Sequence, residues 1–152
     1  MSISQKSKSM EQMRAEEKIF TLVEKALNVQ LEKNPKLYLT NTEYTYIQPD
    51  FYSAEHYIIG EIFAHIGKPK KAQDNKIAND ILKMLLLEKI EEKQYRKIIV
   101  VCDELEEKKL RGASALSESV RQFDVEILYI PIDEQLRQEI LNAQQRQKMT
   151  NA

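Results

Sequence analysis

Two acidic residues, Asp50 and Glu61, have the types, spacing and flanking sequence that favour a shared divalent-metal site. Asp50 follows Pro49, which ends a strand pattern because proline has no N–H to donate to a sheet. Glu61 follows the apolar run Ile58-Ile59-Gly60, and such a run is typical of a buried strand. A carboxylate from a loop and a carboxylate from the next strand would then meet, and oxygen ligands suit Mg²⁺.

Each carboxylate also has a plain structural interpretation. Pro-Asp is a common turn dipeptide, so Asp50 fits a turn as well as it fits a metal site. Glu61 lies among apolar neighbours, where an ionised carboxylate is costly unless it is paired or bound to a cation. Glu61 is therefore either a metal ligand or the partner of a basic residue on the first helix, and we favour the metal ligand.

The elements that would position these residues follow an α/β order. The apolar periodicity predicts four helices, over Glu11–Leu31, Ala72–Glu92, Glu106–Phe123 and from Asp133 to about Gln145. It predicts strands over Lys36–Gln48, Tyr57–Ile66, Arg96–Cys102 and Val125–Ile130. The first of these strands is either one long bent strand or a hairpin broken at Asn41-Thr42. The later strands alternate with helices at the spacing of right-handed crossover units. Asp103-Glu104, after the third strand, is interpreted as a helix-capping pair.

Length and composition indicate one ordinary globular domain. The 152 residues divide into a predicted disordered tail at 1–10, a single domain at 11–145 and a frayed tail at 146–152. No run approaches the ~20 apolar residues of a membrane span, so no membrane partner is expected. Cys102 is the only cysteine and lies in an apolar strand, which favours a reduced core thiol in a cytoplasmic protein. The net charge of −1 argues against a strongly basic, phosphate-coating protein.

The element order and the two carboxylates together resemble the PD-(D/E)XK nuclease superfamily. Pro49-Asp50 matches the first part of the family motif, and Glu61, after Tyr57-Ile58-Ile59-Gly60, matches the second. The resemblance covers about Glu11 to Ile130. It implies the restriction-endonuclease-like fold, a three-layer α/β/α arrangement with a mixed central sheet.

In that family the Asp and the Glu hold Mg²⁺, and a lysine two residues after the Glu lies beside the attacking water. Phe63 stands at the lysine position here. In some members the lysine comes from the helix after the Glu strand, which here carries Gln73 and Lys76. At ~100° per residue, Lys76 lies roughly 140° from the centre of that helix's apolar arc, and Gln73 lies nearer its edge. The helical wheel favours Gln73, although the long side chain of Lys76 can bend back; a solvated lysine is the other interpretation.

Other residues near the motif have weaker claims to chemistry. His65 shares the strand face of Glu61 but lies about 13 Å further along the strand at ~3.3 Å per residue, so we expect a structural role. Some relatives place an extra acidic residue on the first helix, where Glu24, Glu16 and Glu17 are the candidates. For each of these three residues, a solvated helix face is the interpretation that we favour.

Two hypotheses of different class follow. The first is a Mg²⁺-dependent nuclease that hydrolyses phosphodiester bonds of DNA, with Asp50 and Glu61 as metal ligands and Gln73 or Lys76 orienting the water or the phosphate. The alternative is a catalytically inactive nuclease-fold protein that binds a nucleic acid or protein partner, for which Phe63 and the low net charge argue. The resemblance also implies a homodimer, paired through the first or the last helix. A third and weaker hypothesis is a small regulatory domain centred on Asp103.

Overall fold

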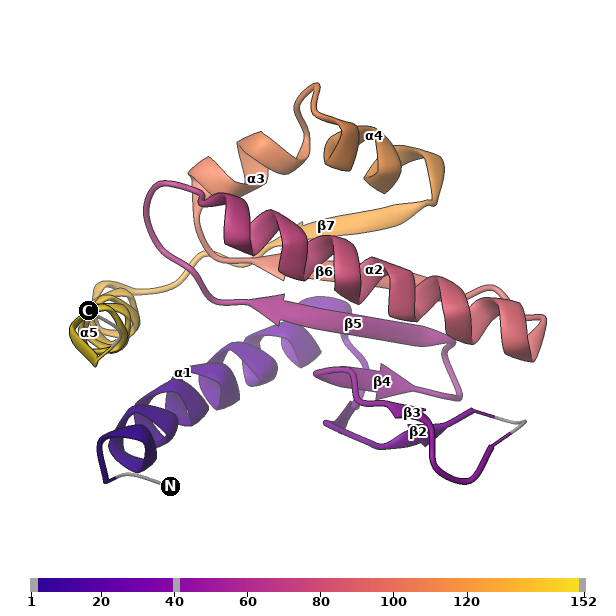
Figure 1. Ribbon diagram of the computed structural model, residues 1–152, viewed down its shortest axis with the longest axis horizontal. Coiled ribbons are helices and arrows are strands. Elements are labelled where there is room, and N and C mark those ends of the chain that lie inside the picture. Colours follow the sequence, from indigo (N-terminus) through magenta and orange to yellow (C-terminus); the bar gives the residue numbers. More distant parts are fainter. Residues whose placement is uncertain (1–2, 40–41, 151–152) are drawn as a thin grey trace.

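A five-stranded mixed sheet forms the centre of the computed structural model, which describes residues 3–39 and 42–150 (Figure 1). Its strands are β1 (Glu32–Lys33), β4 (Phe51–Ser53), β5 (Ile58–Phe63), β6 (Arg96–Val101) and β7 (Val125–Tyr129), in the spatial order β1-β4-β5-β6-β7. A separate pair is formed by β2 (Leu37–Tyr38) and β3 (Tyr46–Ile47). The helices are α1 (Ile3–Leu27), α2 (Lys71–Glu91), α3 (Glu104–Leu110), α4 (Ala115–Gln122) and α5 (Glu134–Thr150).

The direction of the strands changes in the middle of the sheet. Strands β1, β4 and β5 pair antiparallel, whereas β6 runs parallel to β5 and β7 runs parallel to β6. The parallel pairs require crossover connections, which α2 supplies between β5 and β6, and α3 with α4 between β6 and β7. The predicted mixed α/β class with a mixed central sheet is therefore confirmed.

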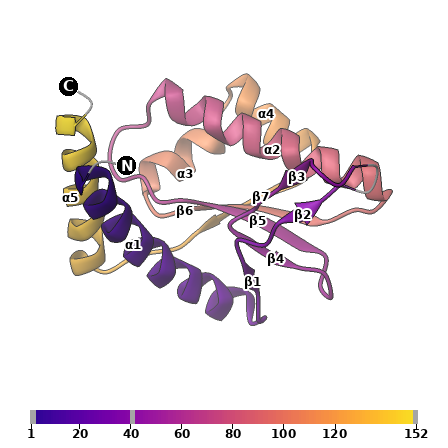
Figure 2. The same ribbon diagram turned by 60° about the horizontal axis from the view of Figure 1, so that its bottom comes forward.

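Helices cover both faces of the sheet (Figures 1 and 2). Alternate side chains of β5 point to opposite faces, so Ile59 and Phe63 pack with the apolar residues of α2, α3 and α4. Ile58 and Ile62 pack on the other side with α1 and α5. Glu61 lies two residues from both Ile59 and Phe63, so its side chain points to the same face of the sheet, the face that α2 covers.

The first helix differs from the prediction at both ends. It begins at Ile3 instead of Glu11, so residues 3–10 of the segment predicted as a disordered tail are helical. Met1 and Ser2 lie outside the described residues. The helix ends at Leu27 because Asn28 adopts a left-handed conformation, with φ of 56°, which asparagine tolerates better than most residues.

The later helices follow their capping residues. The helix predicted over 106–123 is two helices, because Ser114 caps α4 by accepting a hydrogen bond from Ser117 N at 3.1 Å. Asp103 caps α3 by accepting from Leu105 N at 2.8 Å, and the predicted cap Asp133 accepts from Leu136 N at 2.7 Å. The last helix continues to Thr150, beyond the predicted end at Gln145 and into the segment predicted to fray.

The antiparallel partner of β5 is a strand that the sequence did not predict. The hairpin alternative for 36–48 is confirmed, because β2 and β3 pair antiparallel; the predicted break includes Asn41, which lies outside the described residues. That hairpin is not part of the main sheet. Strand β4 instead begins directly after Asp50 and pairs with β5, with Phe51 opposite Gly60.

Gly60 is required by the close approach of β4 to β5. A Cβ atom at this position would lie 1.9 Å from the Phe51 ring, far inside van der Waals contact. Phe51 is fully buried, so the ring has no free space into which it can move. The absence of a side chain at Gly60 thus fixes the distance between the strand that follows Asp50 and the strand that carries Glu61.

Replacing Gly60 with alanine is expected to destabilise the fold by about 1–3 kcal/mol, the usual cost of overpacking a core. Phe51→Ala alone should cost about 3–5 kcal/mol, and the double variant should cost less than the sum because the two groups compete for one space. Urea denaturation of the four proteins measures the cycle. Additive costs would contradict the proposed steric relation.

Candidate functional site

Asp50 and Glu61 lie side by side at the end of the β4–β5 ladder. Because Phe51 pairs with Gly60, the next residues outward are Asp50 on one strand and Glu61 on the other. Asp50 Oδ2 accepts a hydrogen bond from Ile62 N at 2.7 Å, which fixes its carboxylate against β5. The two carboxyl groups are also hydrogen-bonded to each other, so the spacing in the sequence does bring the pair together.

The closeness of the two carboxyl groups changes the protonation of Glu61. Its pKa is raised far above the ordinary value, first by burial, then by the negative charge of Asp50 and by the hydrogen bond to it. Asp80 raises the pKa further, and Lys76 partly opposes the shift. Two carboxylates in a poorly solvated space cannot both ionise easily, so Glu61 keeps a proton at neutral pH when no cation is present.

Two more carboxylates, on the flanking helices, lie close enough to the pair to interact with it electrostatically. Asp80 on α2 is 7% exposed, and its pKa is raised by burial and by the charge of Asp50, against an opposing effect of Lys76. Glu16 on the outer side of α1 has a raised pKa through desolvation and then through Asp50. Of the three acidic candidates on the first helix, Glu16 is therefore the one that senses the pair.

Lys76 brings a positive charge to these acidic groups. Its Nζ lies 3.6 Å from Asp80 Oδ2 and 5.2 Å from the centroid of the Phe63 ring. It also lowers the pKa values of Glu61 and Glu16. The helical wheel placed Lys76 away from the sheet, but its flexible stem bends back over the ring of Phe63.

Gln73, which the helical wheel favoured, has a role in the helix terminus. Its Oε1 accepts a hydrogen bond from Lys70 N at 3.0 Å, and its own backbone N–H donates to Lys70 O at 3.0 Å, at the start of α2. The first of these bonds ties one end of the Gln73 amide to the backbone. The geometry thus associates Lys76, more closely than Gln73, with the acidic pair.

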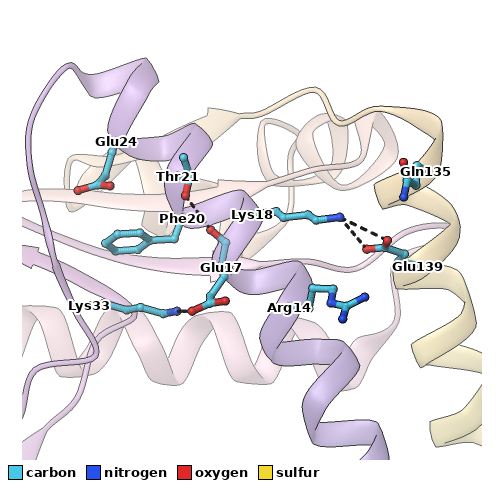
Figure 3. Close-up of a pocket in the computed structure, with 9 residues that line it drawn as sticks. All are labelled: Arg14, Glu17, Lys18, Phe20, Thr21, Glu24, Lys33, Gln135 and Glu139. Atoms are coloured by element: carbon cyan, nitrogen blue, oxygen red, sulfur yellow. Dashed lines mark hydrogen bonds and ion pairs between the residues drawn. The ribbon is translucent and has the colours of Figure 1, made fainter.

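The other acidic candidates on α1 belong to a different surface. Glu24 accepts a hydrogen bond from Leu31 N at 2.8 Å, and Glu17 pairs with Lys33 at 3.2 Å. Figure 3 shows both residues around a hollow of about 750 Å³ that is bridged by the Lys18–Glu139 ion pair. Two of the acidic side chains in this hollow, Glu17 and Glu139, are each paired with a lysine, so this surface does not show the crowding of carboxyl groups that distinguishes the acidic pair.

Asp50 and Glu61 supply the two carboxylates of the predicted metal site without a third ligand of the same kind. Within residues 3–39 and 42–150, no three His, Cys, Asp or Glu side chains converge closely enough to surround an ion. Two carboxylates with a backbone carbonyl and waters are nevertheless a complete oxygen set for Mg²⁺, which normally keeps several waters. Asp80 Oδ2 is buried, and within the described part of the chain its charged partner is the Lys76 ammonium group at 3.6 Å.

Asp80 and Glu16 had no firm signal in the sequence. Asp80 lies one helical turn after Lys76, a spacing at which a lysine and an aspartate commonly pair. This spacing was the sign in the sequence that Asp80 accompanies Lys76.

Comparison with known proteins adds no further assignment: no protein-family model, no curated protein and no solved structure matches the chain. The part of the chain that is described also contains no helix with the length and apolar character needed to cross a membrane.

The raised pKa of Glu61 predicts a pH dependence of stability in the metal-free protein. Above the ordinary carboxyl pKa of 4.5 the unfolded chain ionises while the folded chain keeps its proton, so stability falls as pH rises. The upper limit of this loss is about 1.4 kcal/mol per pH unit for one proton. Glu61→Gln cannot ionise and should have a flatter profile between pH 5 and pH 8, measured by urea denaturation with a chelator present.

Glu55→Gln is the matched control, because the Glu55 side chain is 87% exposed. Its profile should be parallel to that of the unaltered protein. Equal slopes for Glu61→Gln and the unaltered protein would show that Glu61 does not hold an excess proton in the folded state.

Proposed function

We propose that the chain is a Mg²⁺-dependent nuclease of the PD-(D/E)XK type whose lysine comes from α2. The observation that carries this proposal is the position of Lys76 Nζ, 5.2 Å from the Phe63 ring centroid and 3.6 Å from Asp80 Oδ2. Phe63 occupies the motif position of the lysine, so the ammonium group of Lys76 reaches the region that a lysine at position 63 would occupy.

The order of the elements supports the restriction-endonuclease-like assignment. Asp50 and Glu61 are carried by an antiparallel strand pair, β4 and β5, and α2 then crosses to the parallel strand β6. Helix α1 packs on the opposite face and brings Glu16 to the same corner. This is the arrangement that the resemblance implies, and it explains how residues distant in the sequence meet at one end of β5.

The acidic pair fits a hard divalent cation on chemical grounds. Its donors are carboxylate oxygens, which Mg²⁺ prefers. The pKa of Glu61 is raised first by burial and then by the negative charges of Asp50 and Asp80, and a bound cation would oppose both effects. When bound, Mg²⁺ would neutralise developing negative charge and lower the pKa of a coordinated water.

Each of the surrounding side chains has its own role in the proposed mechanism. Asp50 is held in place by Ile62 N, and Glu61 has to release its proton before it can act as an anionic ligand. Lys76 would orient the attacking water and stabilise the charge that develops on the phosphate. Asp80 positions Lys76 through their ion pair, and Phe63 provides an apolar surface below the ammonium group.

The non-catalytic alternative rests mainly on Phe63 and on the net charge of −1. The location of Lys76 weakens the first argument, because a cation is present although the motif position lacks one. The second argument is also limited, because net charge does not describe the local charge of a site. Catalysis is therefore the function that the geometry supports better, and an inactive binding protein becomes an outcome of the tests.

The unaltered protein is expected to cleave DNA when Mg²⁺ or Mn²⁺ is present. Asp50→Asn and Glu61→Gln should each lower the rate by at least about 100-fold, the usual scale for losing one group that stabilises a transition state. The assay follows cleavage of plasmid, single-stranded and branched DNA, with Glu55→Gln as the control. An inactive unaltered protein, or full activity in Glu61→Gln, would contradict the proposal.

A relocation experiment tests the role of Lys76. Lys76→Ala should lower the cleavage rate by about 100-fold, and Lys89→Ala, at an exposed position near the end of α2, should not. Gln73→Ala should have a smaller effect than Lys76→Ala. Adding Phe63→Lys to Lys76→Ala should restore part of the activity, because the amine returns to the family's motif position.

Circular dichroism checks that the double variant folds, since position 63 is 5% exposed. If the double variant does not fold, Lys76→Arg offers a second comparison, in which a cation is kept and part of the activity should remain. Full activity of Lys76→Ala would assign the catalytic cation to another residue.

A further inference from the structure

A pocket of about 270 Å³ opens beside the acidic pair, at the end of β5 and between α1, α2 and α5. Three residues of the candidate active site, Glu16, Phe63 and Lys76, form part of its wall. A group held in this pocket would therefore lie next to the reacting centre. The proposed mechanism does not use the rest of the pocket.

The deeper wall combines apolar surface with neutral polar groups. Ile62, Ile140 and Ala143 supply apolar contacts, and glutamine side chains from three helices supply amides. The Gln144 amide is fully engaged with the backbone of Ile66, accepting from its N–H at 2.8 Å and donating to its carbonyl at 3.0 Å. This pair of bonds fixes α5 against the end of β5 and makes that wall rigid.

Two other glutamine side chains of the wall can hydrogen-bond to a ligand. The side-chain amides of Gln12 and Gln147 have no hydrogen bond to any described residue. His65 Nδ1 also lacks a hydrogen-bond partner within the described part of the chain, but it is buried and does not face the open pocket. Each glutamine amide offers both a donor and an acceptor. Such amides can pair with the donors and acceptors along the edge of a heteroaromatic ring.

The charge of the pocket excludes a phosphate group as its main occupant. Among the described residues that line it, Lys76 is the only permanent cation, and it is already paired with Asp80. The remaining wall is neutral apart from Glu16, whose negative charge would repel a phosphate. A neutral nucleobase fits both the apolar wall and the amide edge.

We propose that this pocket holds one unpaired nucleobase of the strand whose phosphate lies at the acidic pair. A pocket of about 270 Å³ accommodates a single base and excludes a base pair. Recognition of splayed bases by apolar contact and edge hydrogen bonds is typical of single-strand binding. The substrate class is then single-stranded DNA, an overhang or a flap, and not the interior of a duplex. The place of the phosphate rests on the proposed function, whereas the base pocket stands on its own lining.

Binding measured without catalysis tests this inference. Fluorescence anisotropy in the presence of a chelator compares three probes: an eight-nucleotide thymidine strand, a strand of the same length with abasic sites, and a blunt hairpin duplex. The thymidine strand should bind at least about tenfold more tightly than the other two. The abasic strand carries the same phosphates, so it separates recognition of the base from attraction to the backbone.

Gln147→Leu should weaken binding of the thymidine strand at least about tenfold, whereas Gln145→Leu, at an exposed position of α5 outside the pocket, should not. In a ¹H–¹⁵N spectrum, the side-chain amide signals of Gln12 and Gln147 should shift when the strand is added. A uridine strand of equal length shows whether the sugar matters. Equal binding of the abasic strand, equal binding of the duplex, or unchanged binding by Gln147→Leu would each overturn the inference.

These outcomes separate the base pocket from the nuclease proposal. If the unaltered protein fails to cleave DNA but binds the thymidine strand through Gln147, only the catalytic proposal fails. If it cleaves DNA but binds abasic and thymidine strands equally, only the base pocket fails.

Discussion

The crowding of Asp50 against Glu61 is the interaction on which the rest of the site depends. The two carboxyl groups meet because β4 and β5 pair directly beside them and because Asp50 Oδ2 accepts a hydrogen bond from Ile62 N. Their mutual repulsion, added to burial, keeps a proton on Glu61. An arrangement with this excess of negative charge is stable only if protons, a lysine or a metal ion compensate it. Holding these groups together lowers the stability of the fold. Such unfavourable clusters of ionisable groups are typical of functional sites, and this is the physical basis for a functional interpretation.

Lys76 brings a positive charge to the acidic groups from a helix position that points away from the sheet. A lysine at position 63 would start from the strand, on the face that α2 covers. Lys76 starts from α2, one turn before Asp80, and its ammonium group is held between Asp80 and the Phe63 ring. The ring of Phe63 provides a rigid apolar surface beside the ammonium group. The position of the amine, and not the position of the residue in the chain, determines what chemistry is available.

The sequence predicted the parts of the structure that depend on local patterns. The α2 segment has a wide apolar arc and the β6 segment a continuous apolar run, and both patterns are local. The capping role of Asp103 follows from its place after a strand. Strand β4 was missed because it has only three residues, and its existence depends on pairing with β5. The break between α3 and α4 depends on the local Ser114 cap, which competes with an otherwise continuous helical pattern.

The candidate site was predictable in its acidic pair but not in its cation. The positions of Asp50 and Glu61 in the sequence predicted that their carboxyl groups lie close together, and the pairing of β4 with β5 brings them there. A helical wheel describes where a Cβ atom points, whereas the Lys76 amine lies at the end of a flexible stem and follows the nearest negative charge. The contributions of Asp80 and Glu16 arise from the packing of α2 and α1 against the sheet, which periodicity alone does not specify.

A calorimetric titration with Mn²⁺ tests the central claim most directly, because it asks whether the acidic pair binds a divalent cation at all. We expect Mn²⁺ to bind the unaltered protein saturably and to bind Asp50→Asn at least about tenfold more weakly. This substitution removes a charge, but its amide oxygen can still accept the hydrogen bond from Ile62 N. Glu55→Gln should bind as the unaltered protein does. Absence of binding, or equal binding by Asp50→Asn, would contradict the assignment of Asp50 and Glu61 as a metal site.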